Sequence, residues 1–196
     1  MIGTASNGTQ PAPGQLAELL KGLDKSHVGA AMSKMISASI GDICIVMSKS
    51  PAYKFHTLAD IEWLVLPAVL SGQYYVAELE HAEQGMRAPV ACVTWASVST
   101  EVGQRLASDA NTSVRIKPDE WSSGPHLWII HTIGEPKALG AAMNVLAEAA
   151  FKSKTVNVVT RSANGELTVE NLHALLSAAH GAKRQGENPS SEPKPS

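Results

Sequence analysis

The stretch "LWIIHTIGEPKALGAAMNVLAEAAF", residues 127–151, decides the fold because a strand pattern runs directly into a helix pattern. Residues 127–133 form an apolar run with several β-branched side chains, which is typical of a buried strand. Residues 137–151 are rich in alanine and leucine at helical spacing, and Pro136 suits the first turn of a helix. We expect the strand 127–133 and the helix 137–150 to form the centre of the domain.

The segments on either side of this stretch predict the rest of a sheet. Strand patterns are found at residues 73–80, 89–99 and 155–161, and a short one opens the segment 167–180, which continues as a helix. A helical segment to about residue 109 follows the second of these strands, and Asn164-Gly165 predicts the last turn. The predicted fold class is therefore α/β, in the wider sense α+β, with a mixed, mainly antiparallel sheet of about five strands flanked by helices.

The N-terminal part of the chain predicts helices. Leucines at helical spacing fall in residues 16–23, and a second apolar set spans residues 32–47 and should end before Pro51. Thr57 can cap the next helix, which has an acid in its first turn, and Pro67 should kink that helix before a Ser-Gly pair stops it.

Composition and charge fit one soluble globular domain. The chain is 44% apolar and has a net charge of −2, so no global basic field is present for nucleic acid or an anionic membrane. Residues 1–14 and 181–196 are rich in Gly, Pro, Ser and charge, and we expect them to be disordered tails around a domain at 15–180.

The cysteines and histidines indicate a reducing compartment and no metal site. Cys44 and Cys92 stand in apolar surroundings without the spacing of a metal site, which predicts buried free thiols. The histidines have no partners at metal-ligand spacing, so we expect no bound metal. No signal peptide and no uninterrupted apolar span are visible, which predicts a cytoplasmic chain without integral membrane association.

Several short motifs occur in one order along the chain. They are "SPAYK" (50–54), "LPA" (66–68), "GQY" (72–74), "PVA" (89–91), "WASVSTE" (95–101), "WSSG" (121–124) and "LWII" (127–130). In this order the chain resembles the RTX toxin-activating lysine acyltransferases from about Ser48 to Arg161. Each motif is unspecific alone, and their common register carries the resemblance.

The resemblance implies a fold similar to the GNAT acyltransferases. It also implies a reaction in which a fatty acyl group passes from acyl-carrier protein, as a phosphopantetheine thioester, to lysine side chains of an RTX protoxin in the cytosol. No permanently bound cofactor is expected, because the acyl-carrier protein is the donor substrate. An amine that attacks a thioester must lose a proton and needs donors for the developing oxyanion.

The same resemblance implies an altered catalytic pair. Members of the family carry a histidine two positions after the proline of the first motif and an aspartate directly after the strand motif. Here these two positions hold Tyr53 and His131. His56 lies three residues beyond the usual histidine position.

Three hypotheses follow from these substitutions. In the first, His131 is the base and Tyr53 supplies a hydroxyl donor. In the second, His56 takes the vacated position, since residues three apart can share a helical face. In the third, the chain binds acyl-carrier protein or an RTX partner without acyl transfer.

The donor has candidate contacts of its own. The helix after the strand of His131 could receive the phosphate of phosphopantetheine on its free N–H groups, which gives Lys137 and Gly140 as candidate binding residues. Lys49, Lys54 and Arg87 could meet the acidic surface of acyl-carrier protein. A homodimer is compatible with these predictions.

Overall fold

The structure is a computed structural model that describes residues 25–81, 85–108, 115–162 and 164–186. The chain divides into two compact units, Met1–Ala38 and Ser39–Ser196. Of the first unit, residues 25–38 are described, and they form the beginning of helix α2 (Lys25–Lys49). The predicted N-terminal tail and the predicted helix at 16–23 lie outside the described residues.

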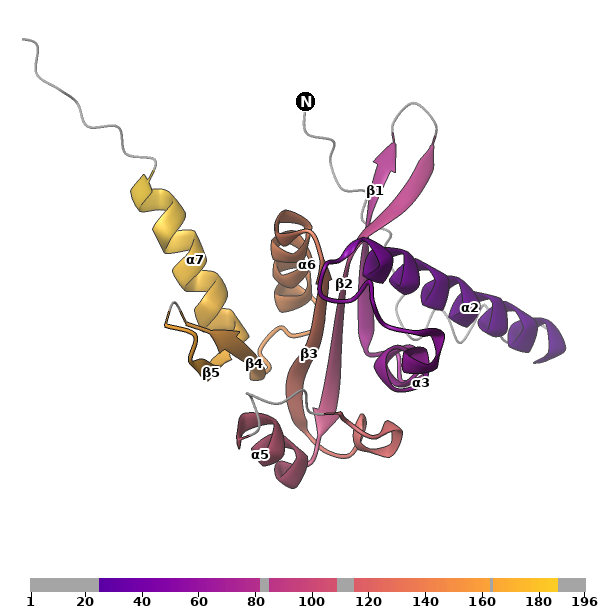
Figure 1. Cartoon of the computed structure of the whole chain (residues 1–196), viewed down its shortest axis with the longest axis horizontal. Coiled ribbons are helices and arrows are strands. Elements are labelled where there is room, and N and C mark those ends of the chain that lie inside the picture. Colours follow the sequence, from indigo (N-terminus) through magenta and orange to yellow (C-terminus); the bar gives the residue numbers. More distant parts are fainter. Residues whose placement is uncertain (1–24, 82–84, 109–114, 163, 187–196) are drawn as a thin grey trace, which may run out of the picture. The chain divides into compact units, whose positions relative to one another are not determined.

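The second unit is built on one open sheet of five strands in the order β1-β2-β3-β4-β5. The strands are β1 (Tyr74–His81), β2 (Met86–Val98), β3 (His126–Gly134), β4 (Val156–Arg161) and β5 (Leu167–Asn171). β3 and β4 are parallel, and the other neighbours are antiparallel. The mixed, mainly antiparallel sheet is confirmed, and the predicted strand 127–133 is its middle strand (Figure 1).

The predicted helices are present as well. They are α3 (Ile61–Leu64), α4 (Leu66–Leu70), α5 (Thr100–Ser108), α6 (Pro136–Glu148) and α7 (Leu172–Gly186), and the 3₁₀ turn η1 (Leu58–Asp60) directly precedes α3. A second 3₁₀ turn, η2 (Pro118–Glu120), was not predicted from the sequence. α3 and α4 divide at Val65, close to the expected kink, because Pro67 has no N–H to continue the ladder. α7 continues to Gly186, into the predicted C-terminal tail, and the rest of that range lies outside the described residues.

Each face of the sheet carries its own apolar cluster. On the first face, Val93, Ile129 and Val156 pack with side chains of α6 and α7. On the second, Ala96 and Trp128 pack with side chains of α4 and α5. We name them the α6–α7 face and the α4–α5 face. Figure 1 shows α6 beside the long strands and α7 beside β4 and β5.

Gly134 allows the connection from β3 to α6 to pass close to β2. Its φ is +119°, and a Cβ there would lie 2.3 Å from the carbonyl oxygen of Val90 and 2.7 Å from Cα of Ala91. Only glycine accepts this backbone conformation and this approach.

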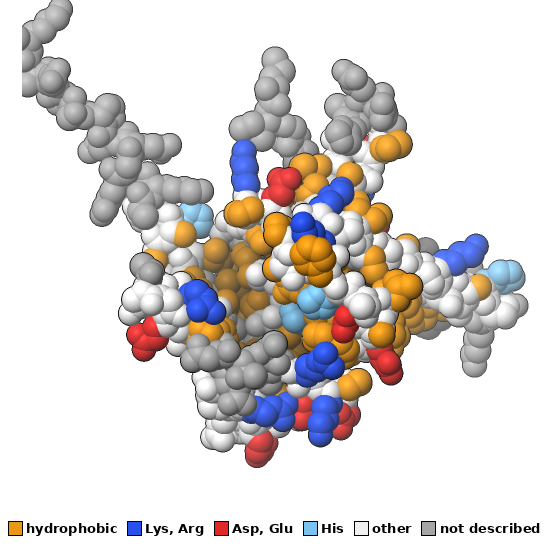
Figure 2. Space-filling model, viewed as in Figure 1, with side chains coloured by type: hydrophobic (Ala, Val, Ile, Leu, Met, Phe, Trp, Pro, Cys, Tyr) orange, Lys and Arg blue, Asp and Glu red, His pale blue; other side chains and the backbone are white. Residues whose placement is uncertain are grey.

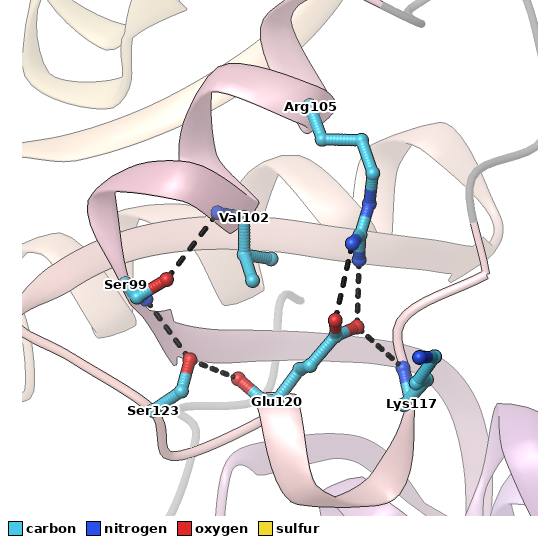
Figure 3. Close-up of polar contacts among 6 residues, drawn as sticks. All are labelled: Ser99, Val102, Arg105, Lys117, Glu120 and Ser123. Carbon is cyan, nitrogen blue, oxygen red and sulfur yellow. Dashed lines mark hydrogen bonds and ion pairs between the residues drawn. The ribbon is translucent and has the colours of Figure 1, made fainter.

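A polar network fixes the loop before β3 against α5 (Figure 3). The Arg105 guanidinium donates to both carboxylate oxygens of Glu120, at 3.1 and 2.6 Å. Glu120 also accepts the backbone N–H of Lys117 at 2.9 Å, and these donors lower the pKa of its carboxyl, with Arg105 the largest cause. Ser123 links the same loop to the backbone N–H of Ser99 at the start of α5, at 2.9 Å. The loop before β3 is therefore tied to α5 and to the residue that precedes this helix.

Helix α2 is long and apolar enough, by length and composition, to cross a membrane. The segment Ser26–Lys49 has 24 residues and contains an 18-residue window with a mean hydropathy of 1.4, of which 17% is buried. Lys34 and Asp42 interrupt the apolar residues of this helix, so no uninterrupted apolar run is visible, whereas a mean hydropathy averages over charged residues. The expected absence of membrane association stays a prediction.

Candidate active site

An extra residue in β3 decides which way His131 points. Thr94 pairs with His131 and Trp95 pairs with Ile129, so Ile130 has no partner on β2. In a bulge of this kind two successive residues oppose one partner residue. Here Ile130 and His131 oppose Thr94, and both side chains lie on the same side of the sheet as that of Thr94. Ile130 packs on the α4–α5 face. His131 therefore points to the α4–α5 face as well.

Tyr53 meets His131 on this face. Ser50-Pro51 ends α2, and the Ser50 carbonyl accepts the backbone N–H groups of Tyr53 and Lys54, which shapes the turn that presents the phenol ring. The Tyr53 hydroxyl lies 3.1 Å from Nδ1 of His131, although 78 positions separate the two residues. Their rings are nearly perpendicular, with centroids 5.8 Å apart. Tyr53 and His131, two of the predicted site residues, are thus in direct contact.

His56 lies beside the phenol ring of Tyr53. Its ring centroid is 5.6 Å from that of Tyr53 and 6.1 Å from that of Trp63, and its side chain is exposed. Asp60 accepts the indole N–H of Trp63 at 3.0 Å, and the Arg115 guanidinium stands 4.2 Å from the Trp63 ring centroid. His56 is therefore held in the cluster by ring contacts rather than by a hydrogen bond to His131.

The protonation states of the pair follow from burial. Burial lowers the pKa of His131 to about 4, and the charge of His56 adds to this effect. Burial also raises the pKa of the Tyr53 hydroxyl, with a smaller contribution from Cys92. At neutral pH the pair is an uncharged imidazole and a protonated phenol, and either can donate to the other.

The Cys92 thiol is a poor nucleophile. Burial raises its pKa to about 12, so the reactive thiolate is scarce at neutral pH. Both cysteines are free, and Cys92 is fully buried whereas Cys44 is half-buried. The prediction of a buried free thiol is therefore confirmed for Cys92, whereas Cys44 is less buried than expected.

Thr94 is a candidate site residue that sequence reasoning missed. It is 1% exposed, and its hydroxyl has no hydrogen-bond partner among the described residues. It pairs with His131 across β2 and β3, so both side chains share one face. Nothing in the spacing of the sequence reveals this neighbour, because the bulge in β3 sets the pairing.

Lys137 and Gly140, the candidate donor contacts, lie in the first two turns of α6. Both are exposed, the first turn holds no acid, and Glu135 at the N-cap makes no side-chain cap. Among the described residues, no hydrogen bond or ring contact joins either residue to the cluster of Tyr53, His56 and His131. The free N–H groups of this turn are the feature that suits a phosphate.

A pocket of about 400 Å³ opens beside Tyr53. Its lining comes from the end of α2 and from the segment after it: Cys44, Met47, Ser48, Tyr53, Lys54, His56, Thr57, Leu58 and Ile61. In Figure 2, histidine side chains lie among hydrophobic ones near the middle of the face shown. A smaller pocket of about 250 Å³, which includes His126 and Asn157, lies between α5 and the starts of β3 and β4. Across the described residues, no group of three or more His, Cys, Asp or Glu side chains could hold a metal ion.

Comparison with known proteins identifies the class of protein. Residues 32–172, well over half of the chain, match HlyC, the RTX toxin acyltransferase family. The chain belongs to the RTX toxin acyltransferase family, and the resemblance read from the short motifs is confirmed.

Two curated relatives are similar to part of the chain. The lysine-acyltransferase RtxC of Vibrio cholerae is 31% identical over 96 residues, which are 48% of this chain and 56% of the relative. The RTX-II toxin-activating lysine-acyltransferase ApxIIC of Actinobacillus pleuropneumoniae is 28% identical over 94 residues, 48% of this chain and 53% of the relative. The matched part thus spans little more than half the length of each relative.

Proposed function

We propose that this chain transfers a fatty acyl group from acyl-carrier protein to lysine side chains of an RTX protoxin and thereby activates it. The contact between the Tyr53 hydroxyl and Nδ1 of His131, at 3.1 Å beside an apolar pocket, is the observation that carries this proposal. Membership of the RTX toxin acyltransferase family gives the reaction class. We take the reaction to run in the cytoplasm, where the protoxin and the carrier protein are made.

In the proposed step the neutral lysine amine attacks the thioester carbon. The new C–N bond forms, the C–S bond breaks, and the amine gives up one proton while the thiolate leaves. Tyr53 lines the pocket and His131 does not. Tyr53 Oη therefore takes the proton of the amine as its own proton passes to Nδ1 of His131, and the reverse transfer gives that proton to the thiolate.

The lowered pKa of His131 has two effects on this step. Because that pKa is about 4, the imidazole is neutral and available at every pH well above 4. It is also a weaker base than an ordinary histidine, so its proton passes readily to the leaving thiolate. The contact of Tyr53 with His131 suits a proton transfer through the phenol to the imidazole and back better than an imidazole that keeps the proton.

The thioester arm of the donor can lie along the open edge of β3. Strands β3 and β4 have two register pairs, Leu127 with Val156 and Trp128 with Asn157, so β3 beyond Trp128 is not paired with β4. An extended arm with amide groups can pair with such an edge. Its phosphate would then reach the first turns of α6, near Lys137 and Gly140. We propose this arrangement together with the GNAT-like interpretation of the fold.

The surface near the pocket offers cations to an acidic carrier protein. Lys49 and Lys54 are exposed, and Lys54 stands over the Phe55 ring with its Nζ 4.9 Å from the centroid. Arg87 already forms an ion pair within the chain, because its guanidinium lies 3.8 Å from the Glu78 carboxylate. We propose Lys49 and Lys54 as the principal contacts for acyl-carrier protein.

The test is direct transfer to lysine. Purified chain is incubated with acyl-carrier protein that carries a labelled fatty acid and with a co-encoded RTX protoxin, and the amide-linked label is located by mass spectrometry. Transfer that falls at least about 10²-fold in both Tyr53→Phe and His131→Asn supports the relay. No transfer by the wild-type chain, with any acyl length, overturns the proposed activity.

A binding role is the second candidate, and the altered pair favours it. If the pair is degenerate, the double variant Tyr53→His with His131→Asp restores the usual family arrangement and gains activity that the wild-type chain lacks. If the pair has taken over the chemistry, that variant has no activity above the wild-type level. Salt-sensitive binding of acyl-carrier protein without transfer by any variant indicates the binding role.

A further inference from the structure

The pocket beside Tyr53 has an apolar floor. Met47 is 6% exposed, and Cys44 and Ile61 are half-buried, so the inner surface consists of thioether, thiol and aliphatic groups. The polar lining groups, Lys54, His56 and Thr57, belong to exposed residues. The inner surface of the pocket is therefore apolar, and its opening carries polar side chains as well.

Large apolar side chains remain exposed around this opening. Leu58 lines the pocket and is 86% exposed, and the neighbouring Phe55 is 82% exposed. Such side chains lose favourable burial when they face water, and adjacent ones of this kind mark binding surfaces. The apolar border formed by these side chains favours an apolar ligand at this opening.

We propose that this pocket holds the linear apolar acyl chain of the donor and that Met47 and Ile61 set its length. The inference rests on the proposed function, since Tyr53 joins the pocket to His131 and so brings the carbonyl end of such a chain to the reacting groups. At roughly 30 Å³ for each methylene, about the volume of a water molecule in the liquid, the volume of about 400 Å³ holds on the order of a dozen methylenes. The ligand class is a medium-length acyl thioester rather than acetyl.

This assignment predicts that affinity for the thioester rises with acyl chain length and then levels off. Each methylene that enters an apolar site improves affinity roughly fourfold. We therefore expect octanoyl and dodecanoyl thioesters to bind progressively more tightly than acetyl. Hexadecanoyl should gain little over dodecanoyl, because the pocket is then full.

Cys44 gives a readout that does not require turnover. It lines the pocket, whereas Cys92, the other cysteine, is fully buried in β2. Maleimide labelling of Cys44 is measured at alkaline pH, since burial raises its pKa, and Cys44→Ser gives the background from Cys92. The probes are N-acetylcysteamine thioesters of acetyl, octanoyl, dodecanoyl and hexadecanoyl groups.

Two variants shorten the pocket, and one matched variant leaves it unchanged. Met47→Trp should weaken protection by the dodecanoyl probe about tenfold or more, while protection by the octanoyl probe changes little. Ile61→Phe, which also adds bulk to the inner surface, should act in the same direction if Met47→Trp does not fold. Ile45→Trp adds the same bulk on α2 at a position that is 44% exposed and does not line the pocket, so it should have no effect.

The outcomes separate this inference from the proposed function. The pocket assignment is supported if protection of Cys44 increases with acyl chain length and if Met47→Trp or Ile61→Phe weakens protection by the longer probes. This holds even if no transfer to protoxin is found. Equal protection by every probe, or equal effects of Met47→Trp and Ile45→Trp, overturns it, even if transfer proceeds. If the wild-type chain shows neither protection of Cys44 by any probe nor transfer to protoxin, both proposals are overturned.

Discussion

The two faces of the sheet use the same strands for different purposes. The α6–α7 face is closed by apolar packing, with Val93, Ile129 and Phe151 in one buried cluster. The α4–α5 face carries the contact of His131 with Tyr53 and the unpaired hydroxyl of Thr94. The difference between the faces depends on Ile130, which has no partner on β2 and so turns His131 to the α4–α5 face. A local irregularity of strand register, rather than composition, therefore creates the candidate site.

The largest expected effect comes from His131→Asn, which breaks the reactive side of the comparison. Acyl transfer should fall about 10²- to 10⁴-fold, because the amide cannot accept the proton that imidazole accepts. Initial rates with saturating acyl-carrier protein measure it. The matched variant Ile129→Val, two residues away on the α6–α7 face, should cost about 0.5–1.5 kcal/mol of stability and leave the rate per folded molecule unchanged. Equal losses of rate in both variants would contradict the assignment of the faces.

A substitution on the α6–α7 face should lower the stability of the fold rather than the rate of acyl transfer. Phe151→Ala removes a ring that is 1% exposed and meets Trp95 edge-on at 5.2 Å between centroids. We expect a loss of about 3–5 kcal/mol in the free energy of unfolding, because the cavity fills poorly. Urea denaturation measures this loss. A loss below about 1 kcal/mol would show that the α6–α7 cluster is not the core described above.

Acid should destabilise the fold through His131. Its pKa is near 6.5 in the unfolded chain and about 4 in the folded chain, mainly because of burial. As the pH falls from 6.5 towards 4, the unfolded state binds a proton that the folded state refuses, so stability drops by up to about 3 kcal/mol. His131→Phe should remove this part of the pH dependence in thermal unfolding. An unchanged pH profile in that variant would mean that another group causes the acid sensitivity.

The smallest expected effect concerns the helix that closes the apolar face. Gly140→Ala should stabilise the fold by about 0.5–1 kcal/mol, because alanine favours a helix interior and a Cβ at this position would meet nothing within 4 Å. Thermal unfolding measures the gain. Destabilisation instead would show that the backbone of α6 needs glycine at this position.

Much of the fold could be predicted from local patterns. The strand at 127–133, the helix at 137–150 and the division near Pro67 follow from side-chain periodicity and from a missing N–H. The capping interaction at Thr57 was also predictable, and its backbone N–H donates to Asp60 at 2.8 Å. These features depend on residues that are near one another in the chain.

The site was predictable only in part. The family resemblance pointed to Tyr53 and His131, but no spacing rule joins residues 78 positions apart. The bulge at Ile130, the position of Thr94 and the pocket around Met47 depend on how distant segments meet. A pattern confined to one segment cannot specify such contacts, because the side-chain period gives a face but not the register of the partner strand.

The short pairing of β3 with β4 also has a consequence for hydrogen exchange. Two register pairs attach the β4–β5 hairpin to the sheet, whereas eight join β2 to β3. Side-chain packing of Val156 and Leu172 in the cluster on the α6–α7 face adds to this attachment. A segment held in this way opens as a cooperative unit at a lower free energy than the whole domain. The amides of β4, β5 and α7 should therefore exchange through a partial opening in which β1, β2 and β3 stay paired and the strand of His131 keeps its shape.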